Sequence, residues 1–218
     1  MMQRKPRFAH QSTEQLYEYW NQRRGTRPAP TRAEIEPSDI RNILPDTFIL
    51  SVDEGRISWR LAGMRICTLH CRELKERDFL ADWLGRERDT IDSLLRAIIA
   101  EAAVTVLQFQ GSAGKGALLN VEMVLMPLST FGRANRILGA MGTLNDPYWI
   151  GIQPPSNRKI GNTRLLWPSG APDNFYGETP SLASAQSRFT QLMTPEIELA
   201  ADRARRYRHL TVMDGGKS

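Results

Sequence analysis

Three side chains that could bind a soft metal ion lie close together in the segment CTLHC, residues 67–71. On a helix, Cys67, His70 and Cys71 would share one face, and thiolate and imidazole groups bind zinc and haem iron. A structural zinc site needs four ligands, however, and the two other histidines belong to the terminal segments. The order C-x-x-H-C also differs from the haem-attachment order C-x-x-C-H. We therefore expect a half-buried histidine and two small apolar thiols, with a haem- or metal-binding sensor as the alternative.

The glycine-rich segment GSAGKG, residues 111–116, suggests a phosphate-binding loop but does not match one. Phe109 stands where the first glycine belongs, Gly116 replaces the serine or threonine, and a strand pattern follows instead of a helix. We expect a hairpin loop. The chain has no G-x-S-x-G or H-E-x-x-H motif, and acid pairs such as Asp78 and Asp82 are usually a solvated helix face. No catalytic residue is assigned, so we expect a protein that is not an enzyme. The sequence by itself requires no cofactor and leaves the identity of any cofactor open.

Basic residues gather near both ends of the chain, as Arg4, Lys5 and Arg7 and within Arg203–Arg208. The net charge of +5 is small for 218 residues and does not by itself indicate a nucleic-acid partner. A nucleic-acid-associated regulator that uses these two clusters is kept as an alternative. No apolar run approaches the roughly 20 residues that span a bilayer, and the basic N-terminus lacks the apolar region of a signal peptide. We expect a cytoplasmic protein with reduced cysteines.

The first element that could position a functional surface is a predicted helix from Ser12 to Arg24. Leu16, Tyr19 and Trp20 share one of its faces. A large apolar face of this kind must be buried somewhere. We weigh two expectations equally: contact with a partner or a second copy of the chain, and packing against the chain's own sheet.

Alternating apolar residues predict a run of strands on both sides of a helical block. Leu44–Val52 and Trp59–Leu61 flank a tight turn, and Ile91, Leu94, Leu95 and Ile98 mark one face of a helix over 86–103. Three more strands are predicted, over 105–110, 118–127 and 136–144. This order indicates an α+β fold with an antiparallel sheet. We expect an N-terminal helix and linker over 1–30, the main domain over 31–145, and an irregular, partly disordered tail over 146–218 with a short helix at 195–208.

With these elements in place, the chain resembles the single-domain PAS proteins of the PAS_5 family, which occur in alphaproteobacteria. The resemblance rests on four segments and the end of the tail: LPDTFILSVD at 44–53, RLAGMRICTLHCRELKERDFLADW at 60–83, the helix at 86–103, MPL…RILGAMGTL at 126–144 and RHLTVMDGG at 208–216. One position departs from the family pattern: Cys71 stands where a glycine commonly precedes Arg-Glu-Leu.

The resemblance implies a five-stranded antiparallel sheet with helices packed on one face. It also implies a sensory or regulatory protein that contacts a signalling protein such as a histidine kinase and is tuned by a small ligand between helices and sheet. The expected lining of that pocket is Leu61, Phe79, Trp83, Leu95, Ile98, Met123, Leu125 and Met141. The alternative is that these side chains simply fill the core, because protein interiors are close-packed.

Overall fold

A computed structural model describes residues 7–53, 55–113, 116, 118–130, 133–167 and 210–213 of the chain. The strands are β1 (Thr47–Asp53), β2 (Arg56–Ala62), β3 (Val104–Ser112), β4 (Leu119–Thr130), β5 (Arg133–Thr143), β6 (Ser156–Leu166) and β7 (Leu210–Met213). The α-helices are α1 (Gln11–Arg24), α2 (Met64–Leu69) and α3 (Gly85–Glu101), and the 3₁₀ helices are η1 (Arg32–Glu34), η2 (Pro37–Ile40), η3 (Leu44–Asp46) and η4 (Phe79–Asp82).

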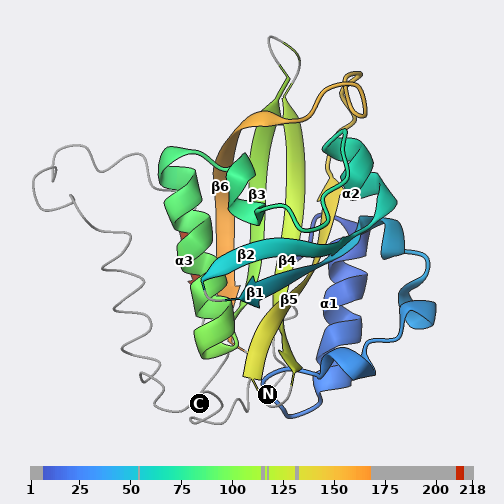
Figure 1. Cartoon of the computed structure of the whole chain (residues 1–218), viewed down its shortest axis with the longest axis vertical. Coiled ribbons are helices and arrows are strands. Elements are labelled where there is room, and N and C mark those ends of the chain that lie inside the picture. Colours follow the sequence, from blue (N-terminus) through green and yellow to red (C-terminus); the bar gives the residue numbers. More distant parts are fainter. Residues whose placement is uncertain are drawn as a thin grey trace, which may run out of the picture.

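All the strands form one sheet with the order β2-β1-β5-β4-β3-β6-β7 (Figure 1). The five predicted strands are its first five, and every pair among them is antiparallel. The predicted α+β, PAS-like fold is therefore confirmed. The sheet then continues beyond the prediction, because β6 pairs antiparallel with β3 and β7 pairs parallel with β6.

The expectation of an irregular segment after residue 145 is wrong for β6. Its sequence, SNRKIGNTRLL, is polar and contains one glycine, which hides the strand pattern. Irregularities in its pairing with β3 also interrupt the alternation of buried and exposed side chains. The helix predicted at 195–208 lies outside the described residues.

Helices cover the two faces of the sheet differently (Figure 1). On one face lie α2, η4 and α3, and the predicted apolar stripe of α3 is completely buried there. On the other face lies α1, whose Leu16 and Trp20 belong to a second apolar cluster together with Ile40 of η2. The sheet is thus the middle layer of three, and α1 belongs to the same folded unit.

The buried carboxylate of Glu122 in β4 links the start of α1 to the middle of the sheet by hydrogen bonds. Glu122 of β4 accepts hydrogen bonds from the backbone N–H groups of Ala9 and His10 at 2.9 and 3.0 Å and from Thr13 Oγ1 at 2.6 Å. Ala9 and His10 directly precede α1, so their N–H groups have no partners within the helix, and the N-terminal end of a helix favours negative charge. The start of α1 therefore compensates a charge that would otherwise be costly to bury.

Candidate functional site

The helical layer and β6 together enclose a charged cluster of His70, Asp82 and Arg158. His70 follows the last residue of α2, Asp82 ends η4, and Arg158 comes from β6. Arg158 Nη2 lies 3.3 Å from Asp82 Oδ2, and His70 Nε2 lies 3.7 Å from the same oxygen. Arg72 Nη2 approaches the other carboxylate oxygen, Oδ1, to 2.5 Å. One carboxylate thus faces two guanidinium groups and one imidazole.

Arg158 is the most unusual member of this charged cluster, because its side chain is only 2% exposed. Its guanidinium carbon lies 5.4 Å from the ring centre of Trp83 and 5.8 Å from that of Phe109, within the range of cation–π contacts. Burial lowers the pKa of Arg158 to about 10, and the negative charge of Asp82 opposes part of this effect. The positively charged guanidinium of Arg158 therefore lies among aromatic rings, where it is less well stabilised than in water.

The His70 ring is oriented by the end of its own helix. Nδ1 lies 2.8 Å from the carbonyl oxygen of Ile66, and because a carbonyl can only accept, Nδ1 carries the proton of the neutral ring. Nε2 then presents a lone pair toward Asp82. Burial lowers the pKa of His70 to about 4, and the positive charge of Arg158 adds to this effect. The ring also packs against Trp59, with 5.6 Å between the ring centres.

Four polar atoms of this region are buried and have no hydrogen-bond partner within the part of the chain that the structure describes. They are His70 Nε2, Asp82 Oδ2, Trp83 Nε1 and Arg158 Nε. Asp82 Oδ2 is engaged only in the ion pair with Arg158 Nη2 at 3.3 Å and retains capacity to accept a further hydrogen bond. Two of the four, on Trp83 and Arg158, are donors, and the other two are acceptors. Most buried polar atoms in proteins are paired, so a group of four in contacting residues is exceptional. Such an arrangement can bind a small polar molecule.

Seven of the eight predicted pocket residues lie in the apolar cluster beside these charges. Phe79, Trp83, Leu95, Ile98, Met123, Leu125 and Met141 are all buried in the cluster between the sheet and α3. Trp83 connects this cluster to the charged one, since its ring contacts both Arg158 and Phe109. Whether these side chains bind a ligand stays a prediction.

The eighth residue, Leu61, was wrongly expected to face the interior, because it is 51% exposed. Simple alternation from Ile57 and Trp59 would bury it. In the β1–β2 pairing, however, Leu50 faces Trp59 and Ile49 faces Leu61, so residue 60 is an extra residue in β2. This bulge reverses the alternation and turns Leu61 outward.

The predicted interaction face of α1 is occupied by the chain's own sheet. Leu16 and Trp20 are completely buried, and Trp20 Nε1 donates to the carbonyl oxygen of Pro127 in β4 at 2.8 Å. Tyr19 is half-buried and accepts a hydrogen bond from the backbone N–H of Glu36 at 2.9 Å. Packing against the sheet, one of the two expectations, is what the structure shows.

The metal-binding candidates do not converge. Cys67 Sγ lies 3.9 Å from the carbonyl oxygen of Ala62, and burial raises the pKa of its thiol. Cys71 is exposed, while His70 points toward Asp82. Among the described residues, no group of three or more His, Cys, Asp or Glu side chains is arranged to hold a metal ion.

Other candidates fall in loops or outside the described part of the chain. Gly111 and Ser112 of the segment 111–116 are the last residues of β3, and Gly111 pairs with Leu119 of β4. Residues 114 and 115 lie outside the described residues, so the expected hairpin loop stays a prediction. Of the basic clusters, Arg4, Lys5 and Arg203–Arg208 lie outside the described residues.

Sequence reasoning missed two members of the charged cluster. Asp82 was expected on a solvated helix face, but its side chain is only 16% exposed and pairs with Arg158. Arg158 itself stands in a polar stretch that carries no strand or site signal. Only the pairing of β6 with β3 brings it to the aromatic residues of the interior.

The comparison with protein families agrees with this geometry. A family model described as a PAS domain, PAS_5, matches residues 8–142. The chain belongs to this PAS domain family. The match includes α1, in agreement with its burial on the sheet, and ends before β6, so Arg158 lies outside it. A search of curated proteins found no match.

Membership in the PAS_5 family implies a sensory or signalling role for this chain. Among the described residues, the structure contains no helix long and apolar enough to cross a membrane.

Proposed function

We propose that this PAS protein is a cytoplasmic, non-enzymatic regulator that contacts a signalling protein such as a histidine kinase. Occupancy of the charged cluster tunes that contact. The observation that carries the proposal is the position of α2, which lies between the charged cluster and an exposed apolar surface. His70 follows its last residue, while its first residue, Met64, is 74% exposed.

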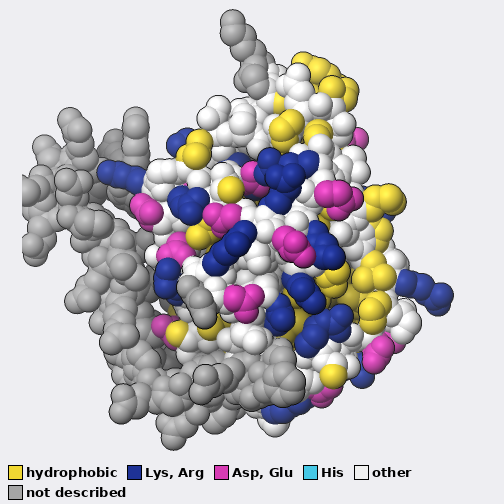
Figure 2. All heavy atoms as spheres, in the orientation of Figure 1, with side chains coloured by type: hydrophobic (Ala, Val, Ile, Leu, Met, Phe, Trp, Pro, Cys, Tyr) yellow, Lys and Arg dark blue, Asp and Glu magenta, His cyan; other side chains and the backbone are white. Residues whose placement is uncertain are grey.

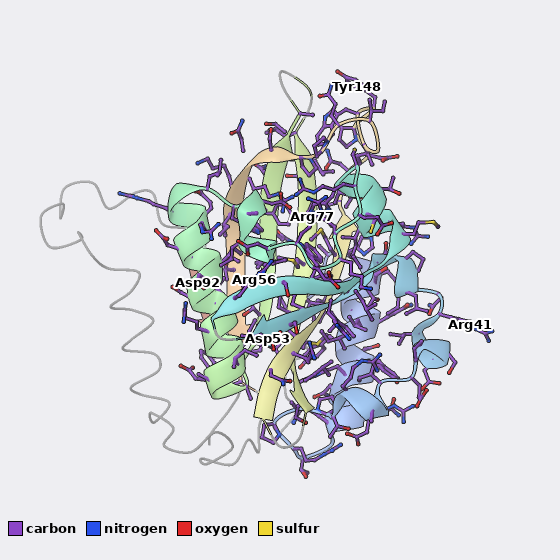
Figure 3. The ribbon with its side chains drawn as sticks, viewed as in Figure 1. Arg41, Asp53, Arg56, Arg77, Asp92 and Tyr148 are labelled. Carbon is purple, nitrogen blue, oxygen red and sulfur yellow. The ribbon has the colours of Figure 1, made fainter. Side chains whose placement is uncertain are left out.

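Four exposed apolar side chains lie on or beside α2, and we call them the α2 surface. Leu61 and Met64 flank the start of the helix, and Tyr148 and Ile152 come from the segment after β5. This segment packs against α2, since a Cβ atom at Gly151 would lie 3.2 Å from Thr68 Cγ2. Tyr148 is 81% exposed and lies at the outer end of the molecule (Figure 3).

The surroundings of the α2 surface suit a protein partner. Figure 2 shows hydrophobic side chains over the end of the molecule that carries this segment, beside a face where basic and acidic side chains alternate. Apolar side chains with a polar border are typical of protein–protein contacts. On the face shown in Figure 2, the described basic side chains are interspersed with acidic ones, which differs from the extended basic surfaces that bind nucleic acid.

Movement of α2 provides the link between interior and surface. The helix has only six residues, about 9 Å of length, so it moves as one short rod. A change in the partners of His70 at its end shifts the start of the helix, where Met64 contacts solvent. Small shifts of packed helices are a common way to transmit a signal.

Affinity capture of the tagged full chain from its native cells, followed by mass spectrometry, tests this function. We expect a signalling kinase to be recovered with the natural chain and lost with Met64→Asp and Tyr148→Asp, since a charge in the centre of an apolar contact is costly. Leu84→Asp is the matched control. Leu84 is exposed but lies at the start of α3, where an aspartate suits the N-cap.

Recovery of the same proteins with all four chains would contradict a role for the α2 surface. Light scattering of the purified protein adds a check on a second copy as partner. A dimer that Tyr148→Asp dissociates would reassign the surface to self-association.

A further inference from the structure

We infer that the charged cluster of His70, Asp82 and Arg158 binds a small hydroxycarboxylate. Its carboxylate accepts hydrogen bonds from Arg158 Nε and Trp83 Nε1, and its hydroxyl group donates to the acceptor pair of His70 and Asp82. The inference rests on the proposed function, because it names the ligand class that a sensory PAS interior would take.

The charge of the cluster calls for an anion. Asp82 is the acidic partner of both Arg158 and Arg72, so two positive charges face one negative charge. His70 adds no negative charge, and its Nδ1–H is already used by Ile66. Because Arg158 is buried, its charge is poorly screened by solvent, and it shares the carboxylate of Asp82 with Arg72, which is 39% exposed. A carboxylate beside it would compensate this charge and add a charge-assisted hydrogen bond.

The two unpaired donors are the groups that would bind the carboxylate. Arg158 uses Nη2 toward Asp82, which leaves the Nε–H without an acceptor among the described residues. The indole N–H of Trp83 is likewise buried and unpaired, and the guanidinium of Arg158 lies over this ring. Two buried N–H donors of contacting residues are a suitable pair for one carboxylate group.

The two acceptors, His70 Nε2 and Asp82 Oδ2, indicate that the ligand also carries a hydroxyl group. His70 Nε2 and Asp82 Oδ2 lie 3.7 Å apart, and in the neutral form of the ring neither carries a proton. A hydroxyl group to one side of this pair can lie within hydrogen-bond distance of both atoms and donate to one of them. A plain carboxylate such as acetate lacks this donor, and a neutral alcohol lacks the carboxylate. The molecule must also be small, because the surrounding side chains form a closely packed core.

Thermal unfolding of the full chain with glycolate, acetate or sodium chloride at equal ionic strength tests the inference. A ligand that binds only the folded state raises Tm. We expect glycolate to raise Tm by roughly 5–10 °C at about 100 times its Kd. Acetate should have a smaller effect, and chloride should reveal any shift that is due to ionic strength alone.

Two variants test the named donors. Arg158→Gln should weaken glycolate binding roughly 10- to 100-fold, because it removes a charged partner. Trp83→Phe keeps an aromatic ring but removes the N–H, and should weaken binding about 2- to 10-fold. If Arg158→Gln does not fold, Trp83→Phe alone still tests whether the named donors bind glycolate. Equal shifts with glycolate and chloride, or glycolate binding unchanged in every folded variant of this pair, would overturn the inference.

Tyr148→Asp separates this inference from the proposed function. Its side chain belongs to the α2 surface and is far from full burial, so glycolate should raise Tm as in the natural chain. Loss of kinase capture together with an unchanged glycolate shift supports two distinct sites. Capture that depends on the α2 surface without any glycolate effect would refute the ligand class alone.

Discussion

Arg158 of β6 reaches Asp82 of η4 with 3.3 Å between Nη2 and Oδ2, and this ion pair joins the added strand to the helical layer. Both elements contribute to the same apolar cluster through their neighbours Phe79 and Leu165. A buried pair of this kind need not stabilise the fold relative to apolar residues. Removing only one partner of the pair, however, leaves the other as an uncompensated buried charge.

We predict that Asp82→Asn lowers the free energy of unfolding by about 3 kcal/mol, because it leaves Arg158 buried without its carboxylate. Urea unfolding of the two chains measures this difference. Asp92→Asn is the matched control, since Asp92 pairs with Arg96 at 2.8 Å on the exposed side of α3 (Figure 3). The control should lose only about 0.5 kcal/mol. Equal losses in the two variants would mean that Arg158 finds another partner.

The pH dependence of stability should report the buried state of His70. Its pKa is about 4 in the folded protein, below the ordinary value of 6.5. Between these two values the unfolded chain binds a proton that the folded protein does not, so stability falls as the pH is lowered. The contribution of His70 is complete above pH 6.5 and is lost toward pH 4, by about 3 kcal/mol.

His70→Asn removes this titration while an amide can still donate to the carbonyl oxygen of Ile66. We expect the difference in unfolding free energy between the natural chain and His70→Asn to shrink as the pH falls from 6.5 to 4. Carboxylates titrate in both chains and largely cancel in the comparison. Parallel pH profiles would show that His70 gains its proton as readily in the folded state as in the unfolded state.

Local patterns in the sequence were sufficient wherever the structure follows regular periodicity. The apolar stripe of α3, with Ile91 and Leu95, and the alternation of β3 to β5 predicted elements that the structure contains. The pattern failed at a bulge, which turned Leu61 outward, and at β6, whose first buried residue is an arginine. A buried Arg158 has no local signal, because its reason is the distant Asp82 and Trp83.

Close packing between α1 and the sheet explains a glycine that the strand pattern alone does not require. A Cβ atom at Gly142 of β5 would lie 2.2 Å from the ring of His10, the N-cap of α1. We predict that Gly142→Ala lowers the free energy of unfolding by about 1–3 kcal/mol, because the ring and the start of α1 must shift. Glu122 would lose part of its hydrogen bonding as a consequence, since it accepts from the His10 N–H.

Gly161→Ala of β6 is the matched control for this substitution. Its Cβ atom would meet only the carbonyl oxygen of Gln108, at 3.4 Å, which is ordinary contact. We expect a change of less than about 0.5 kcal/mol in urea unfolding. If Gly142→Ala were as well tolerated as the control, His10 would have room to move without disturbing α1.

Cys71 stands where the resemblance to the PAS_5 family led us to expect a glycine. The backbone of Cys71 has a φ of 52°, a left-handed conformation that suits glycine, and the chain turns there from α2 toward Arg72. We predict that Cys71→Gly raises the free energy of unfolding by up to about 1 kcal/mol, because the cost of holding a Cβ atom in this conformation disappears. Cys71→Ala, which keeps the Cβ atom, should show no gain. The thiol is exposed, so loss of packing cannot explain a difference between the two variants. If alanine and glycine gave the same stability, backbone strain at this turn would be negligible.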